Sequence, residues 1–110
     1  TTVIATVALL ANRFIGYDGA PATSAGGAHD AQGVSETDAA VGQALPVVTD
    51  YSYPVTAGEA IAQHAFVKPA ADGSGKAITG TATDHCGRAL QASTGDGHVI
   101  EVQVLSHRHT

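Results

Sequence analysis

Apolar and β-branched residues fall in short runs along this chain, and Gly, Asp, Ser and Pro separate one run from the next. Short runs of this composition, bounded by turn residues, are typical of β-strands. The last run alternates between apolar and half-polar positions, as expected of a strand that is covered on at least one face. The pattern predicts strands at Val3–Leu10, Arg13–Tyr17, Gln32–Ser35, Gln43–Val48, Tyr51–Val55, Ala65–Pro69, Lys76–Thr79, Arg88–Ala92 and His98–Leu105.

Turn signals between the runs indicate the fold class. Asp72–Gly75 and Ser93–Gly97 each predict a turn between two neighbouring strands, and Pro54 predicts the edge or the end of a strand. Helical signals are nearly absent: Ala57–Gln63 favours at most one short helical turn, and the Gly-rich Ala22–His29 is interpreted as a loop. Short strands at this spacing predict an all-β fold, a small compact sandwich or barrel of antiparallel strands.

The order of residues also indicates an internal duplication. Similar residues recur at offsets of 52 to 55, in the order aromatic strand, Asp-Gly turn, Gly-led strand, turn and Val-rich strand. Two copies would build two similar β-halves packed on one another. The alternative is chance, because a chain rich in Gly, Ala and Val yields such matches easily. The matched pairs are Phe14 with Phe66, Asp18-Gly19 with Asp72-Gly73, Gly33 with Gly87, Gly42 with Gly97 and Val47 with Val102.

Composition and charge exclude several classes of protein. The 110 residues suffice for one domain with a modest core, and only 14% of them are charged. Five Lys and Arg against ten Asp and Glu give a net charge of −5 without a basic cluster, which argues against nucleic acid or an anionic membrane as partner. No run is long enough to span a membrane, and Thr2–Ala11 lacks the basic start of a signal peptide. We expect an N-terminal arm and first strand at 1–10, a single β-domain at 11–105 and a polar C-terminal tail at 106–110.

Candidate catalytic chemistry is sparse. His85 and Cys86 are adjacent, so on a strand their side chains point to opposite faces, and Cys86 is interpreted as a small buried thiol. A Cys–His pair would need a histidine from elsewhere, such as His98. His107 and His109 share one side of an extended segment, but the sequence supplies no convincing third metal ligand nearby. They are interpreted as part of the polar tail, with metal binding between subunits as the alternative. We predict no catalytic residue, no cofactor and no metal site.

The few aromatic residues all fall on predicted strands or their ends, where they would form the bulky part of a small-residue core. Tyr51 and Tyr53 are two apart and therefore expected on one face, next to Pro54 at a possible edge. An interface role is an alternative for this pair, because Tyr is enriched where subunits meet. The aromatic residues are Phe14, Tyr17, Tyr51, Tyr53 and Phe66.

The order of short motifs over residues 3 to 105 resembles the small capsid-decoration, or cement, proteins of tailed bacteriophages. The Ala22–Asp30 loop, the Tyr51–Pro54 stretch and the His-bearing tail depart from that pattern. The motifs that carry the resemblance are Ala11-x-Arg13-Phe14-Ile15, Asp18-Gly19, Gly33-Val34, Asp38-Ala39-Ala40-Val41-Gly42, Val47-Val48, Ala57-Gly58-Glu59-Ala60-Ile61, Asp72-Gly73 before Lys76-Ala77, Gly87-Arg88-Ala89-Leu90-Gln91-Ala92 and Gly95-Asp96-Gly97-His98-Val99-Ile100-Glu101-Val102.

This resemblance implies a non-enzymatic protein, made in the host cytoplasm, that binds the outer surface of the expanded phage head. Such proteins usually bind as homotrimers and stabilise the head by clamping neighbouring major-capsid subunits. A flexible N-terminal arm that orders on contact is the expected capsid or subunit interface, because it would add a strand to a capsid sheet edge. The residues expected in this interface are Thr1, Thr2, Val3, Ile4, Ala5, Thr6, Tyr51 and Tyr53.

Three alternatives remain open. Another virion structural part, such as a tail-tube or head-fibre module, shares the class but not the location. A biotinyl- or lipoyl-type carrier domain is also a small Gly- and Val-rich β-sandwich, but it needs a modifiable lysine at an exposed hairpin tip, and neither Lys68 nor Lys76 has such flanks. A hydrolase would depend on Cys86 or on a His-bound metal.

Overall fold

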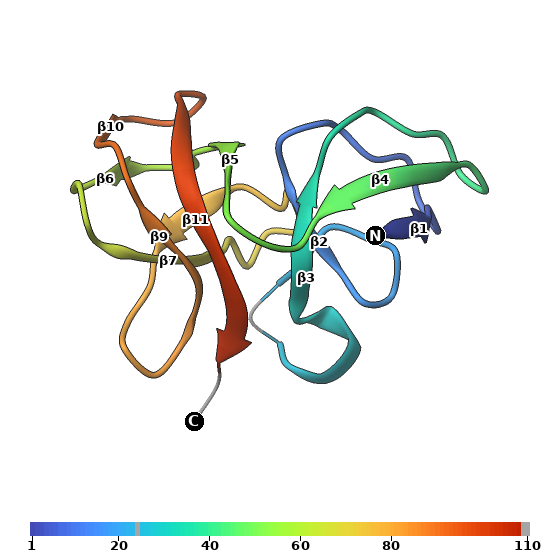
Figure 1. Cartoon of the computed structure of the whole chain (residues 1–110), viewed down its shortest axis with the longest axis horizontal. Helices are drawn as coiled ribbons and strands as arrows, with labels where there is room; N and C mark the ends of the chain where they lie inside the picture. The colour runs from blue at the N-terminus through green and yellow to red at the C-terminus, as the bar shows by residue number, and fades with distance from the viewer. Residues whose placement is uncertain (24, 109–110) are drawn as a thin grey trace.

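The computed structural model describes residues 1–23 and 25–108, and within them the chain is all-β, as predicted. The strands form three antiparallel sheets (Figure 1). Their bounds are β1 Thr2–Ile4, β2 Phe14–Gly16, β3 Ala31–Ser35, β4 Ala44–Val48, β5 Ser52–Thr56, β6 Ala60–Ile61, β7 Phe66–Pro69, β8 Ala77–Thr79, β9 His85–Ala89, β10 Ser93–Thr94 and β11 Val99–Arg108.

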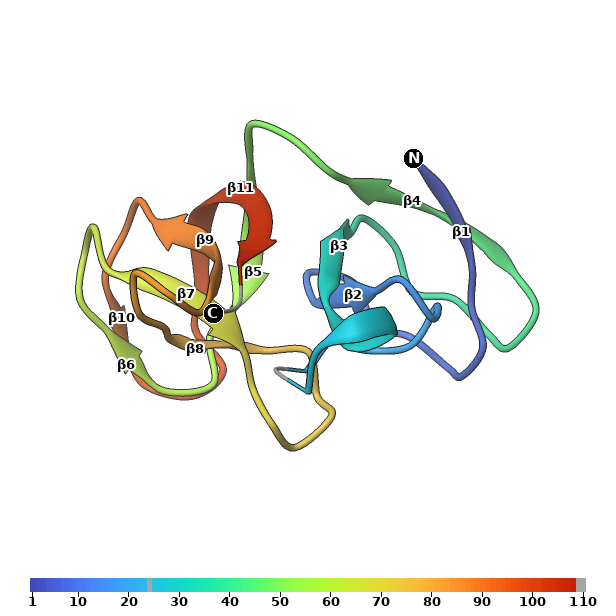
Figure 2. The same cartoon turned by 90° about the horizontal axis from the view of Figure 1, so that it is seen from below.

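The chain is arranged as two halves that lie side by side. In Figure 1 strands β1 to β4 occupy the right side and β5 to β11 the left side, and Figure 2 shows the same separation from below. The N-terminal half is a four-stranded sheet of order β1-β4-β3-β2. The C-terminal half has a five-stranded sheet of order β5-β11-β9-β7-β8 and a small pair of strands, β10-β6. The N-terminal half therefore comprises residues 1–48, and the C-terminal half residues 52–108.

The predicted internal duplication is confirmed by the strand pairing. The order β1-β4-β3-β2 in the first half corresponds to β5-β11-β9-β7 in the second. In the first half Phe14 lies opposite Val34, which lies opposite Val48. In the second half Phe66 lies opposite Arg88, which lies opposite Gln103. These two rows are related by the same offsets that the sequence shows, so the copies share register as well as order.

Backbone details outside the long strands repeat too. Leu9 bridges Ala39 in the first half, and Ile61 pairs with Ser93 in the second. The Asn12 N–H donates to the Ser35 carbonyl at 2.9 Å, and the equivalent His64 N–H donates to Ala89 at 2.8 Å. Asn12 and His64 also share a left-handed backbone, with φ of 61° and 73°. Few non-Gly residues adopt this conformation, so its recurrence at equivalent positions supports duplication over chance.

Gly33 and Gly87 are equivalent glycines whose hydrogen side chains allow two strands to approach closely. A Cβ at Gly33 would overlap the Val48 carbonyl oxygen and lie 2.7 Å from Val47 Cγ1. A Cβ at Gly87 would lie 2.7 Å from both the Gln103 carbonyl oxygen and Val102 Cγ1. Both halves therefore need glycine at this position for the same steric reason.

Each half has its own small-residue core. The core of the N-terminal half is lined by residues that include Val3, Leu9 and Ile15. A second cluster fills the C-terminal half and also receives Phe14 and Val34 from the first half. Hydrogen bonds join the halves as well: the Phe14 N–H donates to the Gly75 carbonyl at 2.8 Å, and Arg13 donates to the Ser74 carbonyl at 3.0 Å. The halves are thus packed into one body.

Several local expectations are wrong. Ala57–Gln63 is not a helical turn, because Ala60–Ile61 pairs with β10; the helix that the described residues contain is a single 3-10 turn at Gly27–His29. Tyr17 and Tyr51 are not in the core but 66% and 83% exposed. Tyr17 follows β2 at a turn and Tyr51 precedes β5 at a bend, so both lie outside the sheets. None of the helices in the described part of the chain is both long and apolar enough to cross a membrane.

The two terminal segments also differ from expectation. The N-terminal segment is not a free arm, because β1 pairs with β4 and buries Val3 and Ala5. The expected polar tail at 106–110 is wrong for 106–108, because β11 continues to Arg108 after a register shift beyond Val104. His109 lies outside the described residues.

Candidate functional site

The histidine and cysteine singled out from the sequence do not form a nucleophilic pair. Cys86 is a buried free thiol. Burial, followed by the nearby carboxylates of Asp84 and Asp30, raises the pKa of this thiol well above its ordinary value of 9.0. The His85 ring instead stacks on Phe66 with centroids 4.3 Å apart, and its Nδ1 lies 2.9 Å from the Thr81 carbonyl oxygen. A protonated, buried thiol is a poor nucleophile.

The two lysines considered for a carrier domain are both held by carboxylates. Lys68 lies on β7 with its Nζ 3.4 Å from Asp84 Oδ2, and Lys76 Nζ lies 2.9 Å from Asp96 Oδ1. Their side chains are only 27% and 25% exposed. Neither lysine stands free at a hairpin tip, which a swinging carrier requires. No pocket is found within residues 1–23 and 25–108.

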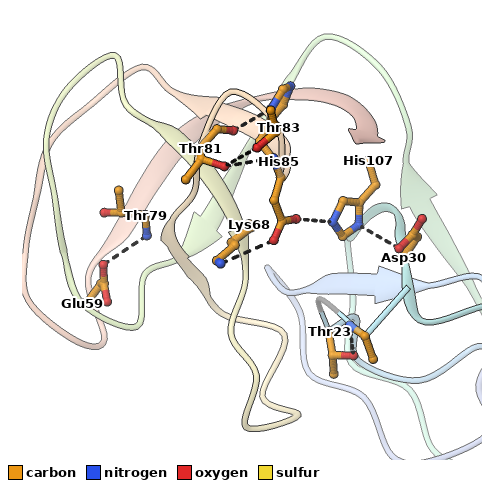
Figure 3. Close-up of polar contacts among 11 residues, drawn as sticks. Thr23, Asp30, Glu59, Lys68, Thr79, Thr81, Thr83, His85 and His107 are labelled. Carbon is orange, nitrogen blue, oxygen red and sulfur yellow. Dashed lines mark hydrogen bonds and ion pairs between the residues drawn. The ribbon is translucent and has the colours of Figure 1, made fainter. Parts of the chain in front are cut away.

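His107 is the centre of a buried polar cluster between the two halves (Figure 3). Its side chain is 1% exposed, and its Nδ1 accepts a hydrogen bond of 2.7 Å from the Ala31 N–H at the start of β3. Its Nε2 lies 3.4 Å from Asp84 Oδ1, and Asp30 Oδ1 lies 3.8 Å from Nδ1. The tautomer that accepts this hydrogen bond at Nδ1 has its N–H at Nε2, which faces Asp84.

This cluster joins elements that are far apart in the sequence. Asp30 and Ala31 belong to the first half, whereas Asp84 and His107 belong to the second. His107 is therefore a structural contact across the junction rather than part of an exposed tail. In the part of the chain that is described, no group of three His, Cys, Asp or Glu side chains is placed to hold a metal ion.

The N-terminal half carries an exposed apolar surface at its outer edge, which we call the edge surface. It comprises Ile4, Val7, Leu10 and Val41, whose exposed fractions are 57%, 43%, 53% and 66%. Backbone hydrogen bonds gather their segments around one turn: the Gly42 N–H donates to Ala5, and the Ala39 N–H donates to Leu9. Residues 1–11 and 39–49 contain no charged side chain. Contiguous exposed apolar patches are a common mark of protein-binding sites, so these residues are the candidate contact surface.

The predicted interface residues Thr1 to Thr6 lie along this edge. Thr1, Thr2, Ile4 and Thr6 are exposed, whereas Val3 and Ala5 are 9% and 2% exposed and belong to the core. β1 is an edge strand, and antiparallel pairing with β4 leaves the backbone N–H and C=O of Thr2 pointing away from its partner. The segment therefore offers alternate side chains and a short stretch of unpaired backbone, in a strand that is already formed.

Tyr51 and Tyr53 do not form the single patch that their spacing predicts. Tyr53 packs against the main core cluster, whereas Tyr51 is exposed and precedes β5. The left-handed backbone of Tyr51, with φ of 62°, breaks the alternation on which that expectation depends. Tyr51 alone remains a candidate contact residue.

Comparison with known proteins identifies the family to which the chain belongs. A family model described as phage cement protein matches residues 1–104. The chain belongs to the phage cement proteins. The resemblance inferred from the motif order is thereby confirmed, and this cement protein is a structural component of the phage head, associated with the capsid of the virion. That family argues against an enzyme.

A solved structure supports the fold of this cement protein. The N base of the head fiber protein gp8.5 of bacteriophage phi29 matches with a TM-score of 0.70 and 17% sequence identity, over 100% of this chain and 96% of that chain. At this identity the likeness shows a shared fold. No curated protein sequence matches the chain.

Sequence reasoning missed part of the edge surface. Val7 and Leu10 fall within the strand predicted at Val3–Leu10, and the expected interface at the N-terminus ends at Thr6, so neither these two residues nor Val41 is among the predicted contacts. A signal that marks them is the absence of charged side chains from both 1–11 and 39–49, which residues 19–29 share.

Proposed function

We propose that this cement protein binds the outer surface of the expanded head and stabilises it by clamping neighbouring major-capsid subunits. The observation that carries the proposal is the uncharged edge surface, which exposes Ile4, Val7, Leu10 and Val41 beside the edge strand β1. A capsid subunit that covers this surface would bury apolar side chains and would pair with the free backbone at Thr2. Binding as a homotrimer would join several such contacts, so that weak individual affinities multiply.

Co-sedimentation with expanded, undecorated heads of the same phage tests the proposal. We expect saturation at a number of copies that matches the three-fold sites of the shell. Ile4→Asp and Val41→Asp place a charge in the edge surface and should abolish most of the binding. Ala71→Asp is the matched control, because Ala71 is exposed on the other half. Circular dichroism shows whether each variant is folded. Failure of the folded wild-type protein to bind would refute the proposal.

The contribution of the β1 backbone to head binding is tested by a substitution rather than by a deletion. Removing Thr1–Thr6 would take Val3 and Ala5 out of the core, so lost binding would be ambiguous. Thr2→Pro removes only the outward N–H of the edge strand. We expect weaker binding to heads with little change in Tm, whereas unchanged binding would exclude strand addition at this edge.

Three further measurements test clamping, recognition of the expanded shell and the assembly state. Decorated heads should resist heat or osmotic shock better than bare heads, and equal resistance would exclude a stabilising role. Equal binding to immature and expanded shells would contradict recognition of the expanded surface. Sedimentation equilibrium of the free protein distinguishes a preformed trimer from one that assembles on the shell.

A second candidate function is that of a head-fibre base. It is favoured by the likeness of the whole chain to the N base of the phi29 head fiber protein. The mass of the polypeptide in purified virions decides between the two. An 11.0 kDa band supports a separate decoration protein, whereas a larger band that contains these residues supports a base module.

A further inference from the structure

The duplication places the same face of the sheet in two different environments. In the first half the row Phe14, Val34 and Val48 packs against the second half, and Phe14 and Val34 are 0% exposed. The equivalent row in the second half is Phe66, Arg88 and Gln103. Here Phe66 is half-buried and both Arg88 and Gln103 are exposed. One copy of this face is thus an interface within the chain, whereas the other copy faces outward.

Arg88 is held in place on this outward face. Its guanidinium carbon lies 5.0 Å from the centroid of the Phe66 ring, and its Nε donates a 2.9 Å hydrogen bond to the His64 carbonyl. The Phe66 ring is itself stacked against His85, at an interplanar angle of 25°. Two contacts therefore fix the plane of the guanidinium before any partner arrives.

The terminal nitrogens of Arg88 are left available. Among the described residues no carboxylate lies within ion-pair distance of Arg88, and its one protein hydrogen bond uses Nε. The four N–H groups at the end of the guanidinium form a fork that matches both oxygens of a carboxylate. Because the side chain is already ordered, binding costs less rotamer entropy than it would for a free arginine.

We propose that the row Phe66, Arg88 and Gln103, together with His85, is a second docking surface, which we call the Arg88 face. Its partner is a carboxylate side chain displayed by a protein on the head surface, and the proposal rests on the proposed function in naming the head as the site of that partner. A phosphate of nucleic acid fits the same fork, but the net charge of −5 repels a polyanion and so favours a side-chain carboxylate.

The Arg88 face complements the edge surface. The edge surface lies on the first half and is uncharged, so it provides apolar burial with little directional specificity. The Arg88 face lies on the second half and offers one oriented ionic contact. Two chemically different contacts on opposite halves let one protein bridge two neighbouring subunits, which is the geometry that clamping requires.

Binding of Arg88 variants to expanded heads tests the proposal. Arg88→Gln removes the charge and the fork, and we expect about tenfold weaker binding or more. Arg88→Lys keeps the charge but loses the fork, so it should recover only part of the affinity. Lys76→Gln removes one positive charge outside this face, where Lys76 pairs with Asp96, and should leave the affinity unchanged. Equal affinity of wild type and Arg88→Gln would overturn the Arg88 face while leaving head binding intact.

A second measurement observes the guanidinium directly and does not require heads. The Nε–H signal of Arg88 in a ¹⁵N spectrum is followed during titration with a short Glu-rich peptide, with its Gln-substituted counterpart and with a short single-stranded DNA. A saturable shift with the Glu peptide alone supports the proposal. A shift with DNA but not with the peptide, or no shift at all, overturns it. Unchanged Tm of Arg88→Gln excludes a merely structural explanation of its lost binding.

Discussion

The two halves of the molecule share a backbone plan but differ in what covers one face of each sheet. In the first half that face carries Phe14 and Val34 and is buried by the second half. In the second half the equivalent positions are Phe66 and Arg88, and the face is open. The register of the strands is the same in both copies. In a duplicated sheet, the side chains on this face therefore differ with the environment of each copy. The glycines and turns are the same in both copies because the backbone is the same.

The halves also differ in the length of their last strand. β4 has five residues, whereas the equivalent β11 has ten. The extra residues of β11 carry His107 to the start of β3, where it accepts a hydrogen bond from Ala31. This extension has no counterpart in the first half. It is the feature that turns two similar sheets into one asymmetric body with a closed junction and an open outer face.

Exchanging residues between the two rows should have the largest effect. Val34→Arg would bury an unpaired guanidinium at the junction, and we expect it to lower the free energy of unfolding by about 4 kcal/mol or more. Arg88→Val removes an exposed cation–π contact and one hydrogen bond, and should cost less than about 1 kcal/mol. Chemical denaturation measures both. Similar costs for the two variants would mean that the rows are not in different environments.

The equivalent glycines test the shared backbone. Gly33→Ala would push Cβ into the Val48 carbonyl, and Gly87→Ala would place it 2.7 Å from the Gln103 carbonyl. Overpacking against backbone typically costs about 1–3 kcal/mol, with Gly33 at the upper end because its overlap is closer. Gly95→Ala is the control, because nothing lies within 4 Å of a Cβ there. If either strand glycine tolerates alanine as well as Gly95 does, close strand approach is not the reason for it.

Much of the backbone plan was predictable from local sequence. Turn residues such as Asp72–Gly75 and β-branched runs such as Gln43–Val48 depend on neighbours along the chain, and the strands β4, β7 and β8 follow them closely. The duplication was predictable because similar residues, such as Gly33 and Gly87, recur in the same order at nearly constant offsets along the chain. These signals are local, so a single sequence carries them.

The side-chain environment was less predictable, because it depends on packing between halves. Tyr51 and Tyr17 were expected in the core on the general preference of aromatic residues, but both lie at turns that project from it. The two-residue strands β6 and β10 are too short for any periodic signal. In the sequence His107 resembles a residue of a polar tail. It is buried because the extension of β11 brings it against the start of β3, which the local sequence does not indicate. The edge surface was found only in part, through Thr1 to Thr6.

Removal of His107 should loosen the junction. His107→Ala leaves the Ala31 N–H without its acceptor and opens a cavity between Asp30 and Asp84, for an expected loss of about 2–4 kcal/mol. His98→Ala is the matched control, because His98 is exposed and Thr94 is the hydrogen-bond partner that its ring has among the described residues. Hydrogen exchange adds a local readout: the Ala31 amide should lose protection in His107→Ala. Retained protection of that amide would show that the histidine does not hold the halves together.

The pH dependence of stability tests the burial of Cys86, which lies in the core cluster that the two halves share. Burial raises the pKa of its thiol in the folded protein, whereas in the unfolded chain the thiol ionises near 9.0. Between these two values unfolding releases a proton, so the free energy of unfolding should fall by about 1.4 kcal/mol per pH unit as the pH rises above 9. Below the pKa of the unfolded thiol, Cys86 is protonated in both states, so its ionisation does not change the free energy of unfolding. Cys86→Ala should abolish this slope while leaving other alkaline effects unchanged. An identical slope in the alanine variant would mean that the junction admits water to the thiol, which would contradict the closed packing between the halves.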